Sequence, residues 1–505
     1  MELSKAKFIY CDYSIEFMGL KEELVKELTR NSSIYLVKAN LINRGYLEED
    51  INSALKGVIE LKSAESDKNN KLMGFKEFFD RVGYGFASQQ FINILFMLSG
   101  ASLFLVGFIN GLKTALIYFL SGFLKEYSRI KYFGKKFIST AGIIYGLSFL
   151  GMAFAVVLHS PSLFVLSLLI GTVGVIAHGD LYVAFFNSIL RSEHRKTFLR
   201  FISYFGIFIT AISIILAALL MESFPVNGTS FNFNPSWLHL AVPIHFQIYG
   251  YLLAFEITAI MFIVSGYLMS FIEEKKDEVY GSIVYATAFV KEYMQTARED
   301  SRIFIKNKKV LLLTLAAILM TIIQVVGNSY FGIFIYNNFQ HQFFGGFMNV
   351  AIIFVIALIT SISGTMLTKA FAKSLGEAPM LVFGTLLVAL LPLTMYYNPN
   401  LYAIGLATAL SIIGGAVVGV AQGLIAERLM SEKEQVTYFS GLGFVSIIPT
   451  FIIVMIGAII AQTYSLQTLF LGLGIALAAI VMPIYFILVL IIDREYKKDL
   501  AVSGK

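Results

Sequence analysis

Long runs of apolar residues, separated by short polar segments, fill the chain from about residue 79 to residue 495. A helix needs about 20 apolar residues to span a bilayer, with a range of about 17–25. The runs meet this length. They predict twelve membrane-spanning helices, at residues 82–98, 101–124, 134–158, 162–189, 198–221, 247–272, 309–336, 343–367, 379–396, 400–426, 437–461 and 465–492. The pattern is that of an all-α polytopic membrane protein.

Residues 1–75 have a different pattern, with frequent charges and apolar residues at helical spacing, as in IEFMGLKEELVKEL. They predict a small helical cytosolic domain, followed by a polar linker, SAESDKNNK, at residues 63–71. The alternative is a partly ordered tail that packs on the membrane domain. No long apolar region lies at the N-terminus, so we expect no cleaved signal peptide, with the first span acting as the insertion signal.

Basic residues gather on one side of the predicted bundle. The alternate connections contain no Lys or Arg; these are residues 99–100, 159–161, 222–246, 337–342, 397–399 and 462–464. The remaining connections carry many, as in GFLKEYSRIKYFGKK. Cytoplasmic loops are enriched in Lys and Arg. The asymmetry therefore predicts a cell-membrane protein with both termini in the cytoplasm.

Two landmarks repeat along the chain at nearly the same offset. The polar segment that begins at Gly122 returns at Gly364, 242 residues later, and Ser192-Glu193 returns as Ser431-Glu432 after 239. This predicts two parallel six-helix repeats, one known transporter architecture. The expected parts are residues 79–272 and 309–495, a cytosolic linker at 273–308 and a tail at 496–505.

Composition narrows the function classes. Charged residues make up 14% of the chain and apolar residues 57%, with a mean hydropathy of +0.74, whereas soluble proteins carry about 25% charged residues. The net charge of +6 fits basic cytoplasmic loops and gives no argument for nucleic acid. A single cysteine, Cys11, excludes an internal disulfide and a multi-cysteine metal site. No ATP-binding P-loop, HExxH motif or catalytic triad is recognisable, so we expect neither an enzyme nor a cofactor.

The connection after the second predicted span resembles a signature of the major facilitator superfamily (MFS), close to Gly-x-x-x-Asp-Arg-x-Gly-Arg-Arg. The residues that carry the resemblance are Gly122, Glu126, Gly134, Lys135 and Lys136. About five extra residues lie between the acid and the second glycine. In the second half Gly364 and Lys369 fit the pattern, but Thr368 replaces the acid.

The resemblance implies a secondary transporter that moves a small-molecule substrate by alternating access, coupled to an ion or a proton. It also implies that the loop at Gly122–Lys136 acts as a conformational gate. The alternative is a basic cluster that only fixes membrane orientation.

Three ionisable residues lie near mid-depth of their predicted spans, where a charge is costly unless it is paired or faces a cavity. These are Lys113, Asp180 and Glu256. We expect Lys113 and Asp180 to interact, either as a substrate or proton site or as a structural ion pair. Glu256 is a weaker candidate for ion coupling.

The first span of each half carries two amides at i, i+4 spacing, which places them on one helix face. The pairs are Gln89 with Asn93 and Gln324 with Asn328. In the resembled family these spans line the central cavity, so the amides could bind a polar solute. The alternative is hydrogen bonding between helices.

Two other functions stay open. One is a nucleotide translocase-type exchanger, which has a similar length and number of spans. The other is a membrane sensor or scaffold that acts through a cytosolic protein partner of residues 1–75.

Overall fold

The computed structural model describes residues 34–44, 46–130, 134–189, 192–224, 227–233, 244–273, 301–305 and 307–503. These fall into two compact units, divided on helix α3 between Gly74 and Phe75. The short segment Phe271–Glu273 groups with the first unit.

The first unit contains α2 (Ile34–Asn43) and the beginning of α3 (Glu48–Phe86). Helix α3 runs straight through residues 63–71, so the predicted linker was wrong. The segment SAESDKNNK is polar but has neither Gly nor Pro, and Ala, Glu and Lys are good helix formers. Polarity alone does not end a helix.

Packing within this unit combines a small apolar core with one amide contact. Val37, Leu41 and Ile51 are fully buried. The Asn69 side chain donates to the carbonyl of Glu273 at 3.0 Å and accepts from its N–H at 2.9 Å. The amide thus satisfies both backbone groups of one residue.

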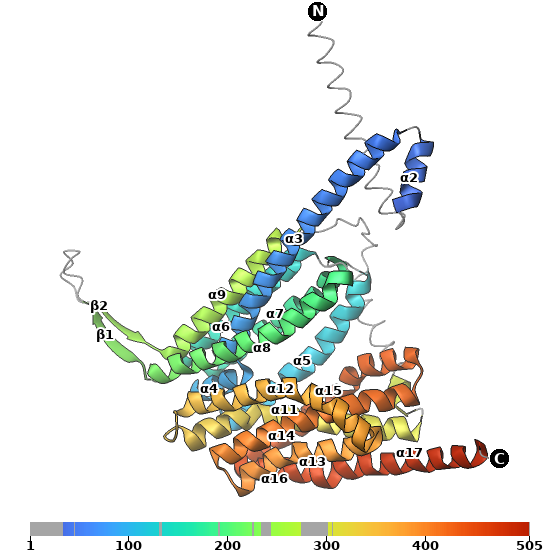
Figure 1. Ribbon diagram of the computed structural model, residues 1–505. Helices are drawn as coiled ribbons and strands as arrows, with labels where there is room; N and C mark the ends of the chain where they lie inside the picture. The colour runs from blue at the N-terminus through green and yellow to red at the C-terminus, as the bar shows by residue number, and fades with distance from the viewer. Residues whose placement is uncertain are drawn as a thin grey trace, which may run out of the picture. The chain divides into compact units, whose positions relative to one another are not determined.

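Eleven helical segments among the described residues are long and apolar enough to cross a membrane. They are α5 (Leu103–Ile130), α6 (Lys135–Val157), α7 (Pro161–Ile189), α8 (Ser192–Ser223), α9 (Gly250–Phe271), α11 (Lys308–Phe339), α12 (Gly346–Leu375), α13 (Glu377–Tyr397), α14 (Leu401–Leu429), α15 (Glu432–Thr463) and the run formed by α16 (Leu466–Ala476), the π-helical turn η3 (Leu477–Val481) and α17 (Met482–Ser503). These agree with eleven of the twelve predicted spans (Figure 1).

The remaining predicted span, 82–98, is broken. Helix α3 ends at Phe86 and α4 (Gln89–Leu98) begins after Ser88, which is extended with ψ of 148°. Gly83 and Gly85, just before the break, weaken the helix there. Because α4 has only ten residues, the count of twelve spans stays a prediction.

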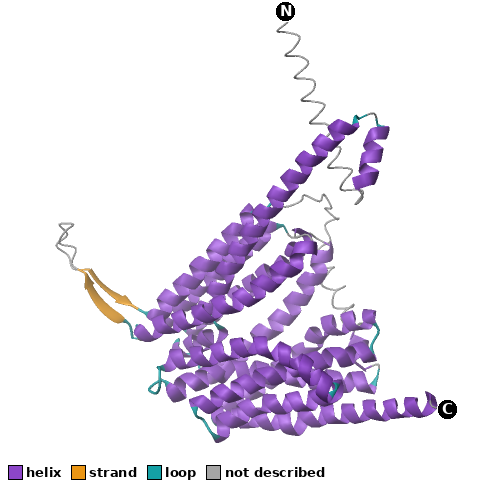
Figure 2. Ribbon diagram, viewed as in Figure 1, coloured by secondary structure: helices purple, strands orange, loops and turns teal. Residues whose placement is uncertain are grey.

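Besides helices and loops, the described part of the chain contains a two-stranded sheet, drawn in orange in Figure 2. Strands β1 (Thr229–Phe233) and β2 (Ile244–Ile248) pair antiparallel between α8 and α9. The sequence analysis did not predict them. We call the end of the bundle that carries these strands the hairpin end; α4 and α5, α11 and α12, and α15 and α16 are also connected there. The opposite end is the basic end.

The two helical halves contact each other near the hairpin end. The Tyr330 hydroxyl on α11 donates to the carbonyl of Leu103 on α5 at 3.0 Å. The rings of Phe91 on α4 and Phe347 on α12 lie 6.0 Å apart. Both contacts join residues of different halves, and Leu103 and Phe347 lie in the first turns of their helices.

A carboxylate also joins the two halves at the hairpin end. Glu222, at the end of α8, accepts from the N–H of Phe347 at 3.2 Å, in the first turn of α12. A negative charge is favourable at a helix N-terminus. Gly345, with φ of +97°, lies so close that a Cβ would be 2.1 Å from the carboxylate. A side chain at 345 would therefore displace Glu222.

Close packing at Gly107 generates a stability prediction. A Cβ on Gly107 of α5 would lie 2.0 Å from the Tyr330 hydroxyl and 2.7 Å from the Ala458 Cβ, both in the other half. We expect Gly107→Ala to destabilise the protein by roughly 1–3 kcal/mol, because overpacking forces the halves apart. Thermal unfolding in detergent measures this. The matched control is Gly419→Ala, which meets nothing within 4 Å. Equal midpoints for the two variants would contradict the contact.

Candidate functional site

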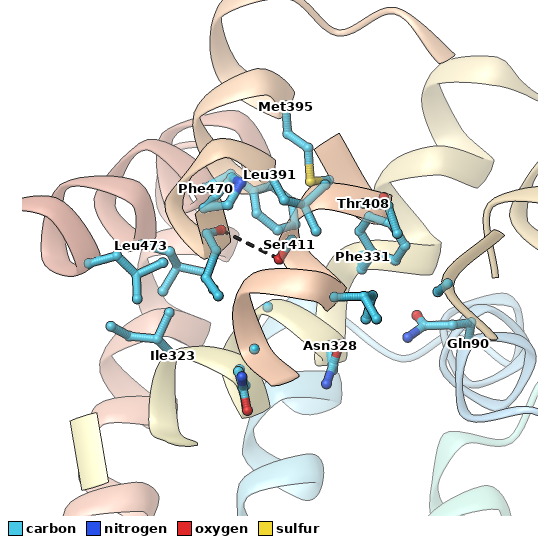
Figure 3. A pocket seen from close by; sticks show the side chains of 18 of the residues that line it. Gln90, Ile323, Asn328, Phe331, Leu391, Met395, Thr408, Ser411, Phe470 and Leu473 are labelled. Atoms are coloured by element: carbon cyan, nitrogen blue, oxygen red, sulfur yellow. Dashed lines mark hydrogen bonds between the residues drawn. The ribbon is translucent and has the colours of Figure 1, made fainter. Parts of the chain in front are cut away.

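A cavity of about 360 Å³ lies within the helical bundle. Its lining comes from α11, α12, α13, α14, α16 and η3 of the second half, together with Gln90 of α4 (Figure 3). The volume lies in the range of small-molecule sites, about 300–1,000 Å³. One residue from the first half thus completes a cavity built by the second half.

Two backbone features shape the wall formed by α13 and α14. Gly384 and Gly414 face each other so closely that a Cβ on Gly414 would lie 2.5 Å from the Gly384 carbonyl. Pro392, within α13, lacks an N–H and leaves the carbonyl of Val388 without its usual helical donor. The Ser411 hydroxyl of α14 points at that carbonyl at 3.5 Å, drawn as the dashed line in Figure 3.

The cavity lining is apolar with a few uncharged polar groups. Three phenylalanines line it, Phe331, Phe354 and Phe470. The polar lining residues are Gln90, Gln324, Asn328, Thr408 and Ser411. No Asp, Glu, Lys, Arg or His belongs to the described lining. Such a surface suits a neutral solute that has both polar and apolar parts.

The predicted amide pair of the second half lies in this cavity. Gln324 and Asn328 both line it and are both exposed. Within the described part of the chain, neither side chain makes a hydrogen bond. Their amides are available to a ligand.

The predicted amide pair of the first half has a different environment. Gln89 donates to Asn93 at 2.8 Å, as the spacing predicts, and to Asn110 of α5 at 3.3 Å. Asn110 in turn donates to Asn93 at 3.1 Å. This pair is held in a network of side chains, and neither member lines the cavity.

The network reaches across to α11 of the second half. Asn93 donates to the carbonyls of Asn328 at 3.2 Å and Ser329 at 3.1 Å. Gln90 accepts from the N–H of Gly332 at 2.8 Å. In an α-helix the N–H of residue 332 bonds the carbonyl of residue 328. Helix α4 therefore offers partners to both members of one helical bond of α11, beside the cavity.

The structure does not bring Lys113 and Asp180 together. The Lys113 ammonium donates to the side-chain oxygen of Gln89, and no ion pair joins it to Asp180. Asp180 and Glu256 are half-buried, on α7 and α9, and neither lines the cavity. The expected contact between Lys113 and Asp180 is therefore absent, and Lys113 belongs to the amide network instead.

The loop that resembles the MFS signature is only partly within the described residues. Gly122 and Glu126 lie on α5, Gly134 precedes α6, and Lys135 and Lys136 open that helix. Residues 131–133 and the side chains of Glu126 and Lys369 lie outside what the structure describes. In the second half Gly364 is buried, and a Cβ there would lie 3.2 Å from Ala416 of α14. Thr368 bonds back to the Gly364 carbonyl at 2.7 Å.

A buried charged cluster was missed by the sequence analysis. Lys76 and Asp80 on α3 form an ion pair at 2.5 Å, and Asp80 also contacts His178 on α7 at 3.3 Å and Ser265 on α9 at 2.5 Å. All four side chains are at most 4% exposed. The i, i+4 spacing of Lys76 and Asp80 was the available signal, but both lay just before the first predicted span.

No family model matches the sequence, and no curated protein matches it. Solved structures do match. The crystal structure of the nucleoside transporter NupG has a TM-score of 0.60 at 13% identity, covering 84% of this chain and 98% of that one. A bacterial homologue of the human lysosomal transporter Spinster, inward-facing and unoccupied, gives 0.56 at 14%, covering 85% and 97%. A bacterial homologue of the iron transporter ferroportin, inward-facing, gives 0.56 at 13%, covering 83% and 98%.

These likenesses span nearly the whole of each matched protein. The chain has the fold of the MFS transporters, which confirms the resemblance found in the sequence.

The contact between α4 and α11 generates a second stability prediction. Asn93→Leu removes two hydrogen bonds to α11 and two from neighbouring amides. At about 0.6 kcal/mol per bond within a membrane, we expect a loss on the order of 2 kcal/mol in thermal unfolding. The control is Asn338→Leu, because Asn338 bonds only the carbonyl of Phe334 in its own helix. A loss no larger for Asn93→Leu than for the control would count against the contact.

Proposed function

We propose that this chain is a secondary active transporter that carries a small, uncharged polar solute by alternating access. The observation that carries the proposal is the cavity, in which the side chains of Gln324 and Asn328 make no hydrogen bond within the described chain and the rest of the lining is mostly apolar. Amides that line a cavity without a protein partner are available to a ligand. The fold adds support, because every solved structure compared above is titled a transporter or its homologue.

The cavity chemistry narrows the substrate class further than the fold does. Among the similar structures, one is a nucleoside transporter and another is a homologue of an iron transporter. A lining of amides, hydroxyls and phenylalanines, without carboxylate or histidine, favours a neutral organic solute over a metal ion. The same lining has no cation, which argues against a nucleotide translocase-type exchanger.

The conformation fits one state of such a cycle. At the hairpin end the halves are joined by Phe347 and Glu222, and by the bond from Tyr330 to the first turn of α5. The connections there lack Lys and Arg, so the positive-inside rule places this end outside and both termini in the cytoplasm. Closure at that end corresponds to an inward-facing state, the state named in the titles of two of the similar structures.

Roles follow for the predicted residues. Gln90, Gln324 and Asn328 bind the solute. Gln89, Asn93 and Lys113 hold α4 against α11 in the closed state. The gate at Gly122–Lys136 and ion coupling at Asp180 or Glu256 stay predictions, as does a cytosolic partner of residues 1–75.

A ligand screen tests the cavity. The full chain in detergent is heated with a panel of nucleosides, sugars, amino acids, organic anions and metal ions, and the unfolding midpoint is recorded. Ligands that bind the folded state raise the midpoint. We expect neutral polar solutes to do so. Asn328→Ala and Gln324→Ala should each weaken binding about tenfold, equal to about 1.4 kcal/mol.

The matched control is Gln340→Ala, at the end of the same helix but outside the cavity. It should bind like the wild type. Stabilisation by metal ions or organic anions alone would overturn the substrate class. Binding that is unaffected by both cavity variants would place the solute elsewhere.

A further inference from the structure

Gln90 is the residue that the first half contributes to the described cavity lining. It lies on α4 and is only 2% exposed, while Gln324 and Asn328 on α11 are exposed. Figure 3 shows its amide pointing from α4 toward Asn328. The amide therefore lies where the two halves and the cavity meet.

The partner of this amide fixes which of its two ends faces α11. The N–H of Gly332 lies 2.8 Å from Gln90 Oε1, and a backbone N–H can only donate. A flipped amide would place its own N–H groups against this donor, so the oxygen faces α11. Gly332 also makes the approach possible, because a Cβ there would lie 2.7 Å from Oε1. The nitrogen then points away from Gly332.

The nitrogen of Gln90 has no partner within the described part of the chain. The bond to Gly332 is the one hydrogen bond that this side chain makes there. The unbonded polar side-chain atoms that the described residues enclose completely belong to Ser88, Tyr182 and Thr450. The Gln90 nitrogen is not one of them, so it is reached from the cavity. A donor held in this way is available to an acceptor on a bound solute.

The other polar side chains of the described lining offer different chemistry. The hydroxyls of Thr408 and Ser411 already donate to carbonyls of the backbone, which leaves them as acceptors. The amides of Gln324 and Asn328 each offer a donor and an acceptor. Gln90 is the one polar side chain of this lining that offers only a donor.

We propose that Gln90 is a specificity-determining residue: its Nε2 donates to an uncharged acceptor of the solute, such as a carbonyl oxygen, and disfavours a group that only donates, such as an ammonium. An ammonium there would face N–H groups, and no Asp or Glu belongs to the described lining to compensate its charge. Because the same amide bonds Gly332 through its oxygen, one side chain joins the solute's acceptor to α11. The inference rests on the proposed function, since it takes this cavity as the solute site.

Two probes of the same ring size test this selectivity, ε-caprolactam and azepane. Caprolactam has a carbonyl acceptor, whereas azepane lacks it and is an ammonium near neutral pH. The full chain in detergent is heated with increasing concentrations of each probe, and binding is measured from the rise of the unfolding midpoint. We expect caprolactam to raise the midpoint of the wild type and azepane to leave it unchanged.

Gln90→Glu reverses the chemistry at one atom. One carboxylate oxygen keeps the bond from the Gly332 N–H, and the other replaces the donor by an acceptor. We expect this variant to bind azepane, because an ammonium pairs with a carboxylate. A residue that only held α4 against α11 would not produce this gain. The matched control is Gln340→Glu, at the exposed end of α11 and outside the cavity, which should respond like the wild type.

Gln90→Met has a similar length but no N–H donor, so it serves as a second variant if Gln90→Glu does not fold. We expect it to bind caprolactam about tenfold more weakly than the wild type does. Unchanged caprolactam binding in Gln90→Met would overturn the inference, as would equal binding of the two probes by the wild type. A folded Gln90→Glu that does not respond to azepane would do the same. So would the absence of any shift with either probe, because the cavity admits both rings.

The outcomes separate this inference from the proposed function. A neutral solute from the ligand screen whose binding depends on Gln324 and Asn328, but not on Gln90, would leave the transporter cavity intact and remove the role of Gln90. Binding of no neutral solute at all would remove the proposed function, and this inference with it.

Discussion

A polar group inside a bilayer has no water to bond, so it must be satisfied by the protein or face a water-filled or ligand-filled space. This constraint separates the polar residues of the spans into two kinds. Asn93, Asn110 and Gln89 satisfy one another, and Asn93 also satisfies α11. Gln324 and Asn328 have no such partners and line a cavity. The unsatisfied pair therefore marks the place where a solute replaces protein partners.

The contact between α4 and α11 links the two halves of the bundle. It joins the first helix of one half to the first helix of the other, and it lies beside the cavity. It also continues, through the break at Ser88, into α3 with its buried Lys76 and Asp80. A change in solute occupancy would thus act on this pair of helices. The hydrogen bond from Phe347 to Glu222 is a second contact between the halves. It must break when the hairpin end opens.

Hydropathy and the placement of basic residues were enough to predict the fold. A span must be long and apolar to cross the lipid, and basic residues gather in the loops on one side. Eleven of the twelve predicted spans and the MFS resemblance were confirmed. The broken first span was not predicted, since Ala87 and Ser88 are compatible with a helix and the break depends on packing. Helical periodicity also correctly paired Gln89 with Asn93. Periodicity could not predict which of the two amide pairs makes hydrogen bonds to neighbouring helices. The first pair does so because Asn110, on another helix, lies beside it.

The charged residues were the least predictable part. Depth in a span suggested Lys113 and Asp180 as partners, but depth does not fix which way a side chain points around its helix. Lys113 instead contacts Gln89, and the buried ion pair lies between Lys76 and Asp80. His178, which the sequence analysis did not single out, has partners at both ring nitrogens. Those partners come from α3 and α6, far away in sequence.

The central claim is that the two halves alternate between closure at the hairpin end and closure at the basic end. Paired spin labels test it most directly, after Cys11 is replaced: one pair at Leu158 and Tyr402 near the hairpin end, another at Lys136 and Glu432 near the basic end, all exposed positions. The account predicts two distance populations for each pair, with bound solute shifting the two ends in opposite directions. A single distance at both ends, unchanged by every solute that binds, would contradict it.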